Sequence, residues 1–425
     1  MATTLEQLDI SSLHPKDTSE ETLTFEPFSL PSTNQRILGA PHPPNTPIPL
    51  ALQLSLSGNT KPTLECAIRN NQRPSNARRH SPPSSQNTEP SSSATSPSTP
   101  SPTSAPSRAF GYRPHEIVGI VVDRPFLAPN VATANEAPKE VRIYSHNESP
   151  QVPHAPEYIF IYAHKVPKKG GKTPISSSLE LFHRARPEMP QFIDLLAEEG
   201  GVFKSRVTYT VERQYEFVDG DDEKTKRVKV EAQVARYGRG EYTTSEWSDD
   251  ADSQGQVLTL SHHLLAIRTQ PDTNLPFLFA GLAAYYKNSL EASKGSSAGR
   301  KNVAVQTFRD GTPIPEEYLA TSARITDEIR VLHRWQEGEV LVLDNAIAQH
   351  GREPWEGEKG DRVVLASLFD GESPSETGKG FQSQLNGTTA PLPQTPAAQT
   401  RQIATNPQYA LTNRAMSSLC KPVIT

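Results

Sequence analysis

His146 and Glu148 lie two residues apart in a segment whose composition is typical of an extended strand. Side chains at positions i and i+2 of a strand point to the same side of the backbone, so both could reach one cation. His350 could supply a second imidazole. Two imidazoles and one carboxylate on one face of an octahedron leave three positions open, an arrangement that suits iron(II) in non-haem sites. These three residues are therefore candidate metal ligands.

The His-x-Glu spacing is weak evidence when it is taken alone. With 12 histidines and 48 acidic residues in 425 positions, about one such pair is expected by chance. A histidine also commonly serves as a hydrogen-bonded residue of the core or the surface. A zinc hydrolase would instead need two histidines four residues apart with an adjoining glutamate, and the sequence lacks that motif.

Short apolar runs define the elements that would position these ligands. Runs rich in Val, Ile, Tyr or Phe predict strands at residues 116–122, 158–163, 207–212, 340–343 and 362–369. Apolar spacing predicts helices at residues 178–186, 190–199 and 316–335. Many short strands with few helices favour a β-sandwich or β-barrel with flanking helices. The turn after residue 343 could then present His350 at the mouth of the β-structure.

Four stretches resemble the family of taurine dioxygenase and clavaminate-synthase-like oxygenases, which use iron(II) and 2-oxoglutarate. The resemblance runs from about residue 110 to residue 370. The stretches are residues 146–150 (HNESP), residues 156–162 (PEYIFIY) with the GGKT turn at 170–173, residues 338–345 (GEVLVLDN) leading to HGR at 350–352, and Arg362. The resemblance implies a mainly β fold with flanking helices, the double-stranded β-helix or jelly roll. It also implies Fe(2+) at His146, Glu148 and His350.

The family pattern also indicates where 2-oxoglutarate would bind. Arg362 suits the distal carboxylate because a guanidinium fork binds a carboxylate in a bidentate manner; the alternative is an ion pair with Asp361 or Glu358. Thr173 resembles the family's second donor to that carboxylate, or else caps a turn. Arg352 either contacts the cosubstrate or braces its loop.

The implied reaction is oxidation of an unactivated C–H bond, by hydroxylation or desaturation, of a small organic substrate. O2 and 2-oxoglutarate would be consumed, and succinate and CO2 released. Residues that could line the substrate pocket, or could equally be packing residues, are Asn147, Ser149, Trp355 and Phe369. Taurine is not favoured, because no second cation follows Arg362 in residues 363–367. The alternative function is that of a non-catalytic or defective relative that acts as a binding protein.

Composition divides the chain into four parts. We predict an N-terminal remnant of the oxygenase domain at 1–72, a disordered Ser/Pro/Thr-rich segment at 73–108, the oxygenase core at 109–371 and a low-order tail at 372–425. Family members usually carry a helix and a buried strand before the equivalent of residue 109. Here the Ser/Pro/Thr-rich segment takes that place, so we expect an N-terminal core strand to be missing.

Charge and cysteine content limit the partners and the location. The net charge is -5 and the pI is near 6.2, which argues against nucleic-acid or anionic-membrane binding and favours a small-molecule substrate. Cys66 and Cys420 lack the spacing of a disulfide framework. No segment is typical of a secretory signal or a membrane-spanning helix, so we expect a cytoplasmic protein.

Overall fold

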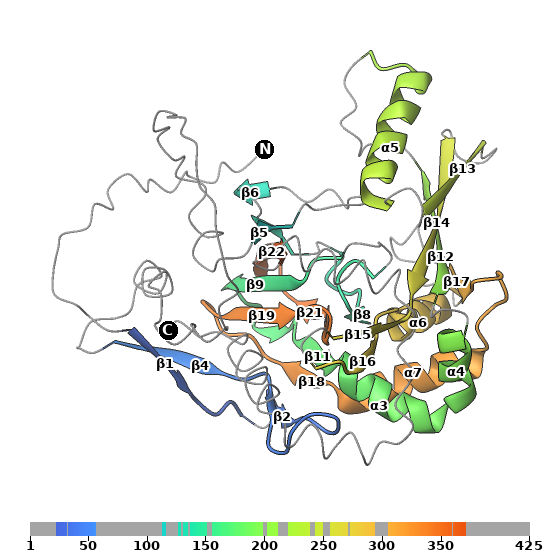
Figure 1. Cartoon of the computed structure of the whole chain (residues 1–425). Helices are drawn as coiled ribbons and strands as arrows, with labels where there is room; N and C mark the ends of the chain where they lie inside the picture. The colour runs from blue at the N-terminus through green and yellow to red at the C-terminus, as the bar shows by residue number, and fades with distance from the viewer. Residues whose placement is uncertain are drawn as a thin grey trace, which may run out of the picture.

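The computed structural model (Figure 1) describes residues 23–31, 33–56, 113–115, 126–128, 131–134, 137–150, 155–198, 202–210, 220–238, 243–249, 256–270, 273–293, 305–358 and 360–370. The strand predicted at 116–122, the segment 73–108 and the tail 372–425 lie outside these ranges. The same is true of the stretch in which the missing core strand would be expected. No helix among the described residues is long and apolar enough to cross a membrane.

Two antiparallel sheets form the centre of the described structure. The first has the order β18-β11-β20-β8, with bounds Val331–His333, Thr173–Ser177, Ala348–Arg352 and Ile143–His146. The second has the order β19-β9-β22-β7-β6, with bounds Val340–Asp344, Tyr158–Lys165, Val363–Asp370, Val131–Thr133 and Phe126–Ala128. A short strand, β5 (Arg113–Pro114), also pairs with β22.

The chain crosses from one sheet to the other at almost every step. Strands β7, β8, β9 and β11 alternate between the sheets, and so do β18, β19, β20 and β22. These eight strands give the order of a jelly roll. Side chains from both sheets meet in one core that includes Ile161, Ile175 and Leu343. The predicted fold class is confirmed, and among the described residues the two sheets remain separate instead of closing into one barrel.

Most of the strands and helices predicted within the described residues are present. Strands β9, β19 and β22 match the predicted runs, and the run at 207–212 overlaps β12 (Val202–Thr210). Helix α3 (Ser178–Glu188) begins at the cap residue Ser177, whose Oγ accepts a hydrogen bond from the Glu180 backbone N–H. The break predicted at Pro187 falls in the last turn of α3, and α4 (Pro190–Glu198) follows.

The predicted helix at 316–335 is too long at its C-terminal end. Helix α7 covers Glu316–Ile329 and buries Ile325 and Ile329 in the core. Arg330 then becomes extended, and Val331 pairs with Ile175 of β11. Pairing with a distant strand therefore overrides the helical periodicity of the sequence.

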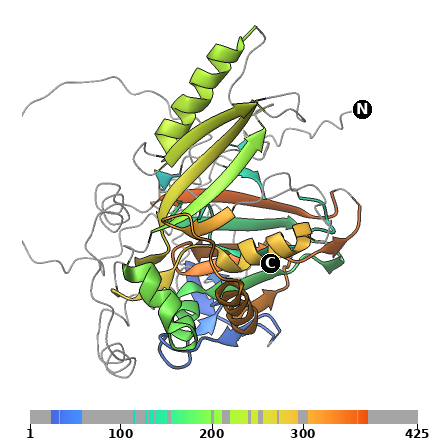
Figure 2. The same cartoon turned by 90° about the vertical axis from the view of Figure 1, so that its right-hand side faces the viewer.

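A long insertion between β11 and β18 supplies most of the helices. It carries α3, α4, α6 (Leu282–Ser293), α7 and the hairpin β15–β16 (Ile267–Thr269 and Pro276–Leu278). It also carries a separate four-stranded sheet of order β13-β14-β12-β17, with bounds Thr243–Asp249, Gln256–Leu265, Val202–Thr210 and Val305–Phe308. In both views this sheet and α5 (Glu223–Gly238) extend away from the jelly roll (Figures 1 and 2).

The N-terminal segment packs against the start of α3. It forms the hairpins β1–β4 (Leu23–Pro27 and Leu52–Leu56) and β2–β3 (Arg36–Ile37 and Pro47–Ile48). Arg36 forms an ion pair with the buried Glu180. His42 Nε2 lies 2.7 Å from Ser177 Oγ. Residues 33–56 thus share buried polar contacts with the start of the helix that follows β11.

Candidate metal centre

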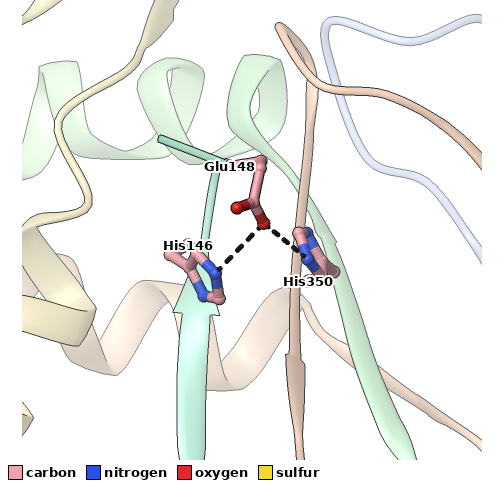
Figure 3. A group of neighbouring side chains, drawn as sticks. All are labelled: His146, Glu148 and His350. Carbon is pink, nitrogen blue, oxygen red and sulfur yellow. Dashed lines mark ion pairs between the residues drawn. The ribbon is translucent and has the colours of Figure 1, made fainter. Parts of the chain in front are cut away.

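The two histidines of the predicted triad lie directly opposite each other on neighbouring strands. His146 is the last residue of β8, and its Cα partner on β20 is His350. Directly opposed residues of an antiparallel pair present their side chains on the same face of the sheet. Glu148, just beyond β8, places its carboxylate between the two imidazoles (Figure 3). The sheet register therefore assembles the three side chains.

The distances between these side chains suit a single bound ion. Glu148 Oε2 lies 3.9 Å from His146 Nε2 and 3.6 Å from His350 Nε2. One ligand atom from each residue can be chosen so that all three lie within 4.8 Å of one another. Donors that share one ion at about 2.1 Å lie about 3–4 Å apart. Nitrogen and carboxylate donors in this number match a 2-His-1-carboxylate iron(II) site.

A backbone contact fixes the orientation of His146. Its Nδ1 lies 2.7 Å from the Tyr144 carbonyl oxygen. A carbonyl can only accept, so Nδ1 carries the proton and Nε2 keeps its lone pair on the side of Glu148. Metal-binding histidines commonly use their second nitrogen in this way.

The buried amide of Asn345 holds the backbone of Glu148 on both sides. Asn345 Oδ1 accepts a hydrogen bond from the Glu148 N–H at 2.6 Å, and Asn345 Nδ2 donates to the Glu148 carbonyl at 3.0 Å. The sequence alone predicts only a turn at Asn345. Asn345 belongs to the GEVLVLDN stretch, which carries the resemblance to the family, and this indicated that the residue matters. Its contact with Glu148 joins residues 197 positions apart and depends on the tertiary fold.

A cavity extends from the three residues into the space between the sheets. Its empty volume is about 650 Å³, part of it open to solvent. Arg362, Thr173, Gly351 and Arg352 contribute polar groups or backbone to the wall together with the triad. The apolar part of the wall consists of Ala134, Ile143, Ile159, Ile161, Val364, Ala366 and Leu368. The candidate metal ligands and the guanidinium of Arg362 therefore line the same cavity, and the wall between them is largely apolar.

Arg362 faces this cavity without a carboxylate partner among the described residues. Its Nε is buried and makes no hydrogen bond there. Asp361 instead pairs with Lys165 at 3.1 Å and accepts from the Glu358 N–H at 2.8 Å. Burial, with a smaller contribution from the charge of Arg352, lowers the pKa of Arg362 to about 10. The side chain thus remains a cation at neutral pH, in an environment that favours an anionic ligand.

The turn before β11 lies against Arg362. Gly171 has φ of +67°, and a Cβ atom there would come within 3.5 Å of Arg362 Nε and 2.9 Å of Pro167 Cγ. Thr173, two residues further on, is buried and accepts a hydrogen bond from Trp335 Nε1 at 2.8 Å. The Gly-Gly-x-Thr turn thus brings a hydroxyl group and a guanidinium to the same cavity.

Arg352 braces a loop, although it also lines the cavity. Its guanidinium donates to the carbonyl oxygens of Ala137, Pro138 and Val141 at 2.9, 2.7 and 2.6 Å. Of the two roles predicted for Arg352, these contacts favour the structural one.

The four residues predicted as substrate-pocket candidates do not line this cavity. Asn147 is fully buried, and its amide donates to the Asn345 carbonyl at 2.7 Å. Phe369 is buried against Phe160, with ring centroids 4.8 Å apart. Ser149 adopts a positive φ of 52° in the loop after Glu148. Trp355 pairs with Gly170 in the small two-stranded sheet of β10 and β21 (Lys169–Gly170 and Trp355–Glu356).

Comparison with known proteins agrees with this architecture. The family model "Taurine catabolism dioxygenase TauD, TfdA family" matches residues 96–367. A clavaminate synthase-like protein of Arabidopsis thaliana is 30% identical over 269 residues, which cover 61% of this chain and 74% of the relative. Dapdiamide synthesis protein DdaC of Enterobacter agglomerans is 26% identical over 246 residues, covering 56% and 69%. The match to the crystal structure of PvcB from Pseudomonas aeruginosa has 16% sequence identity and a TM-score of 0.28, and it covers 56% of this chain and 60% of that one.

The chain belongs to the TauD/TfdA family of dioxygenases. It is a 2-oxoglutarate-dependent dioxygenase, an oxidoreductase that uses Fe(2+) with 2-oxoglutarate and O2 as cosubstrates. Enzymes of this class oxidise C–H bonds of small organic substrates and release succinate and CO2.

Proposed function

We propose that His146, Glu148 and His350 bind the iron(II) of this oxygenase, and that Arg362 and Thr173 bind the distal carboxylate of 2-oxoglutarate. One observation carries the proposal. A metal-binding triad and a half-buried arginine that has no ion-pair partner among the described residues line one cavity. A dicarboxylate can reach both, with one end at the metal and the other at the guanidinium.

The bound iron and 2-oxoglutarate would supply the oxidative chemistry, and the protein residues have separate tasks. The imidazoles of His146 and His350 present neutral nitrogen donors, and Glu148 supplies negative charge to the ion. Arg362 aligns the cosubstrate by its far end. The apolar cavity wall lies along the space between these two ends.

The retained groups favour an enzyme over a defective relative that only binds a partner. All three ligands, the cation and the threonine of the family pattern occur together in the described structure. The substrate is a small organic molecule, and the lack of a second cation in residues 363–367 argues against taurine. The cysteine usage supports a cytoplasmic location.

Anaerobic titration with Co(II), read from its visible absorption, tests the ligand set independently of turnover. His146→Ala, Glu148→Ala and His350→Ala should each lower metal affinity by more than about 100-fold and abolish succinate formation from 2-oxoglutarate. His164→Ala, which removes an exposed histidine on β9, is the matched control and should bind Co(II) normally. Wild-type affinity in any one of the three variants would remove that residue from the ligand set.

A further inference from the structure

Trp335 donates the hydrogen bond that Thr173 accepts at the cavity wall. The indole lies just after β18 and is 6% exposed, within the core between the two sheets. Its Nε1 is 2.8 Å from Thr173 Oγ1. His333, which is the register partner of Thr173, packs edge-on against the indole at 5.2 Å between ring centroids. The indole is therefore held in place from two sides.

The turn that carries Trp335 is also anchored by a buried carboxylate. Glu339 Oε2 lies 3.0 Å from His333 Nε2 and accepts a hydrogen bond from the Gln336 N–H at 2.8 Å. Glu339 and His333 are both buried. These contacts close the turn between β18 and β19, so the indole N–H has a fixed direction toward Thr173.

An indole nitrogen donates a hydrogen bond but cannot accept one. Thr173 Oγ1 must therefore act as the acceptor toward Trp335, and its own proton has to point elsewhere. The contact with Trp335 is the side-chain hydrogen bond of Thr173 within the described structure. Because Thr173 lines the cavity that also holds Arg362, the remaining direction for the hydroxyl proton is the cavity.

We propose that Trp335 is a positioning residue that makes Thr173 a dedicated hydrogen-bond donor to an anionic oxygen beside Arg362. The inference rests on the proposed function, in which that oxygen belongs to the distal carboxylate of 2-oxoglutarate. A carboxylate only accepts hydrogen bonds, so a donor-only threonine and a guanidinium are matched to it. Accepting a hydrogen bond from the indole N–H also polarises the hydroxyl and strengthens the hydrogen bond that the hydroxyl donates.

A double-mutant cycle separates this role from simple packing. The affinity for N-oxalylglycine, a non-reactive analogue of 2-oxoglutarate, is measured with the full-length Zn(II)-loaded protein. Thr173→Val should weaken binding about 10- to 100-fold, because a bond to a charged group is lost. Trp335→Phe keeps an aromatic ring and should weaken binding about 3- to 10-fold. In the Thr173→Val background, Trp335→Phe should have no further effect.

Control variants distinguish a positioning role of Trp335 from a packing role, and both from an error in the proposed cosubstrate site. Trp247→Phe removes an indole N–H of β13 that donates to Glu231 of α5, away from the cavity, and it should leave the affinity unchanged. An equal loss from Trp335→Phe in the presence and absence of the Thr173 hydroxyl would overturn the inference and leave a packing role. If Arg362→Ala also bound the analogue normally, the proposed cosubstrate site itself would be wrong.

A second measurement does not require Trp335→Phe to fold. The protein has three tryptophans, so the indole N–H signals in a nitrogen-15 correlation spectrum are few. We expect the chemical shift of one signal, that of Trp335, to change when N-oxalylglycine binds to the Zn(II) protein. That signal should be shifted in Thr173→Val and should no longer respond to the analogue. An indole signal that responds equally with and without the Thr173 hydroxyl would contradict the coupling.

Discussion

His146 and His350 are direct cross-strand partners, and their ring centroids lie 4.8 Å apart. The register between β8 and β20 therefore determines the distance between the two imidazoles. A slip of one residue would turn one histidine to the opposite face of its sheet. Immediately after His350 the register shifts, between His350 and Arg352. The metal site thus occupies the last regular pair of this ladder.

Gly351 allows β20 to approach β8 at this point. A Cβ atom at Gly351 would lie 2.4 Å from the Ile143 carbonyl oxygen and 3.0 Å from Pro174 Cγ. We expect Gly351→Ala to push the strands apart, to lower the free energy of unfolding by about 1–3 kcal/mol and to weaken Co(II) binding at least about 10-fold. Urea unfolding and anaerobic Co(II) titration measure the two effects.

Gly311→Ala is the comparison for this variant. Gly311 has φ of +91°, and no atom lies within 4 Å of a Cβ built there. This exchange introduces backbone strain without crowding and should leave Co(II) affinity unchanged. Normal metal binding by Gly351→Ala would show that the close approach of the strands is not required.

Arg362→Ala tests the role of the half-buried guanidinium at the cavity wall. If its guanidinium binds the distal carboxylate, the apparent affinity for 2-oxoglutarate should fall about 30- to 1000-fold. Arg362→Lys should recover part of the loss, because an ammonium keeps the charge without the fork. The metal-to-ligand absorption band of the anaerobic iron(II) protein reports this affinity. A variant that unfolds much more readily yet binds 2-oxoglutarate normally would assign Arg362 to the scaffold.

Arg352→Met should show the opposite pattern. Three backbone carbonyls lose their hydrogen-bond donor, so we expect the free energy of unfolding to fall by roughly 3–5 kcal/mol. At a temperature where the variant is folded, its affinity for 2-oxoglutarate should change by less than about 3-fold, because the cation at Arg362 remains. Calorimetry and the same absorption titration measure both quantities. A large loss of affinity for 2-oxoglutarate, with an unchanged free energy of unfolding, would instead indicate that Arg352 binds the cosubstrate.

Local sequence patterns could predict much of the fold and the candidate ligands. His146 and Glu148 are two residues apart, and an extended segment would place both on one side. In the structure β8 ends at His146, and the amide of Asn345 holds the backbone of Glu148 beyond the strand. The strands β9, β19 and β22 are continuous apolar runs, which makes their positions readable from composition. Arg362 could be assigned only through the resemblance to the family, by its place twelve residues beyond His350 and just before the last of these runs.

Contacts between distant segments could not be predicted in the same way. Thr173 and Trp335 are 162 residues apart, and no local periodicity links them. Asn345 appears in the sequence as a turn residue. Its hydrogen bonds to the Glu148 backbone form only when the fold brings β8 and β19 together. The end of α7 was misplaced for the same reason, because pairing with β11 decides the conformation of residues 331–333.

The buried His42 predicts how stability depends on pH. Burial, together with the charge of Arg36, lowers the pKa of His42 to about 4 from 6.5. The unfolded chain therefore binds this proton more tightly than the folded protein does. Above pH 6.5 both states are neutral, and the stability is fully present. Between pH 6.5 and 4 the unfolded state gains the proton first, so the stability falls as the pH decreases.

We expect this histidine to remove roughly 2 kcal/mol from the free energy of unfolding between pH 7 and pH 5. In His42→Gln an amide can keep the contact with Ser177 Oγ but does not titrate, so the loss between pH 7 and pH 5 should be smaller by about that amount. Urea unfolding at the two pH values measures it, with the exposed His164→Gln as control. His262 is a second buried histidine with a pKa lowered to about 4 by burial, so part of the acid sensitivity should remain in His42→Gln. An unchanged pH dependence in His42→Gln would mean that His42 becomes protonated in the folded protein without penalty, and that its packing against α3 opens before the rest of the fold.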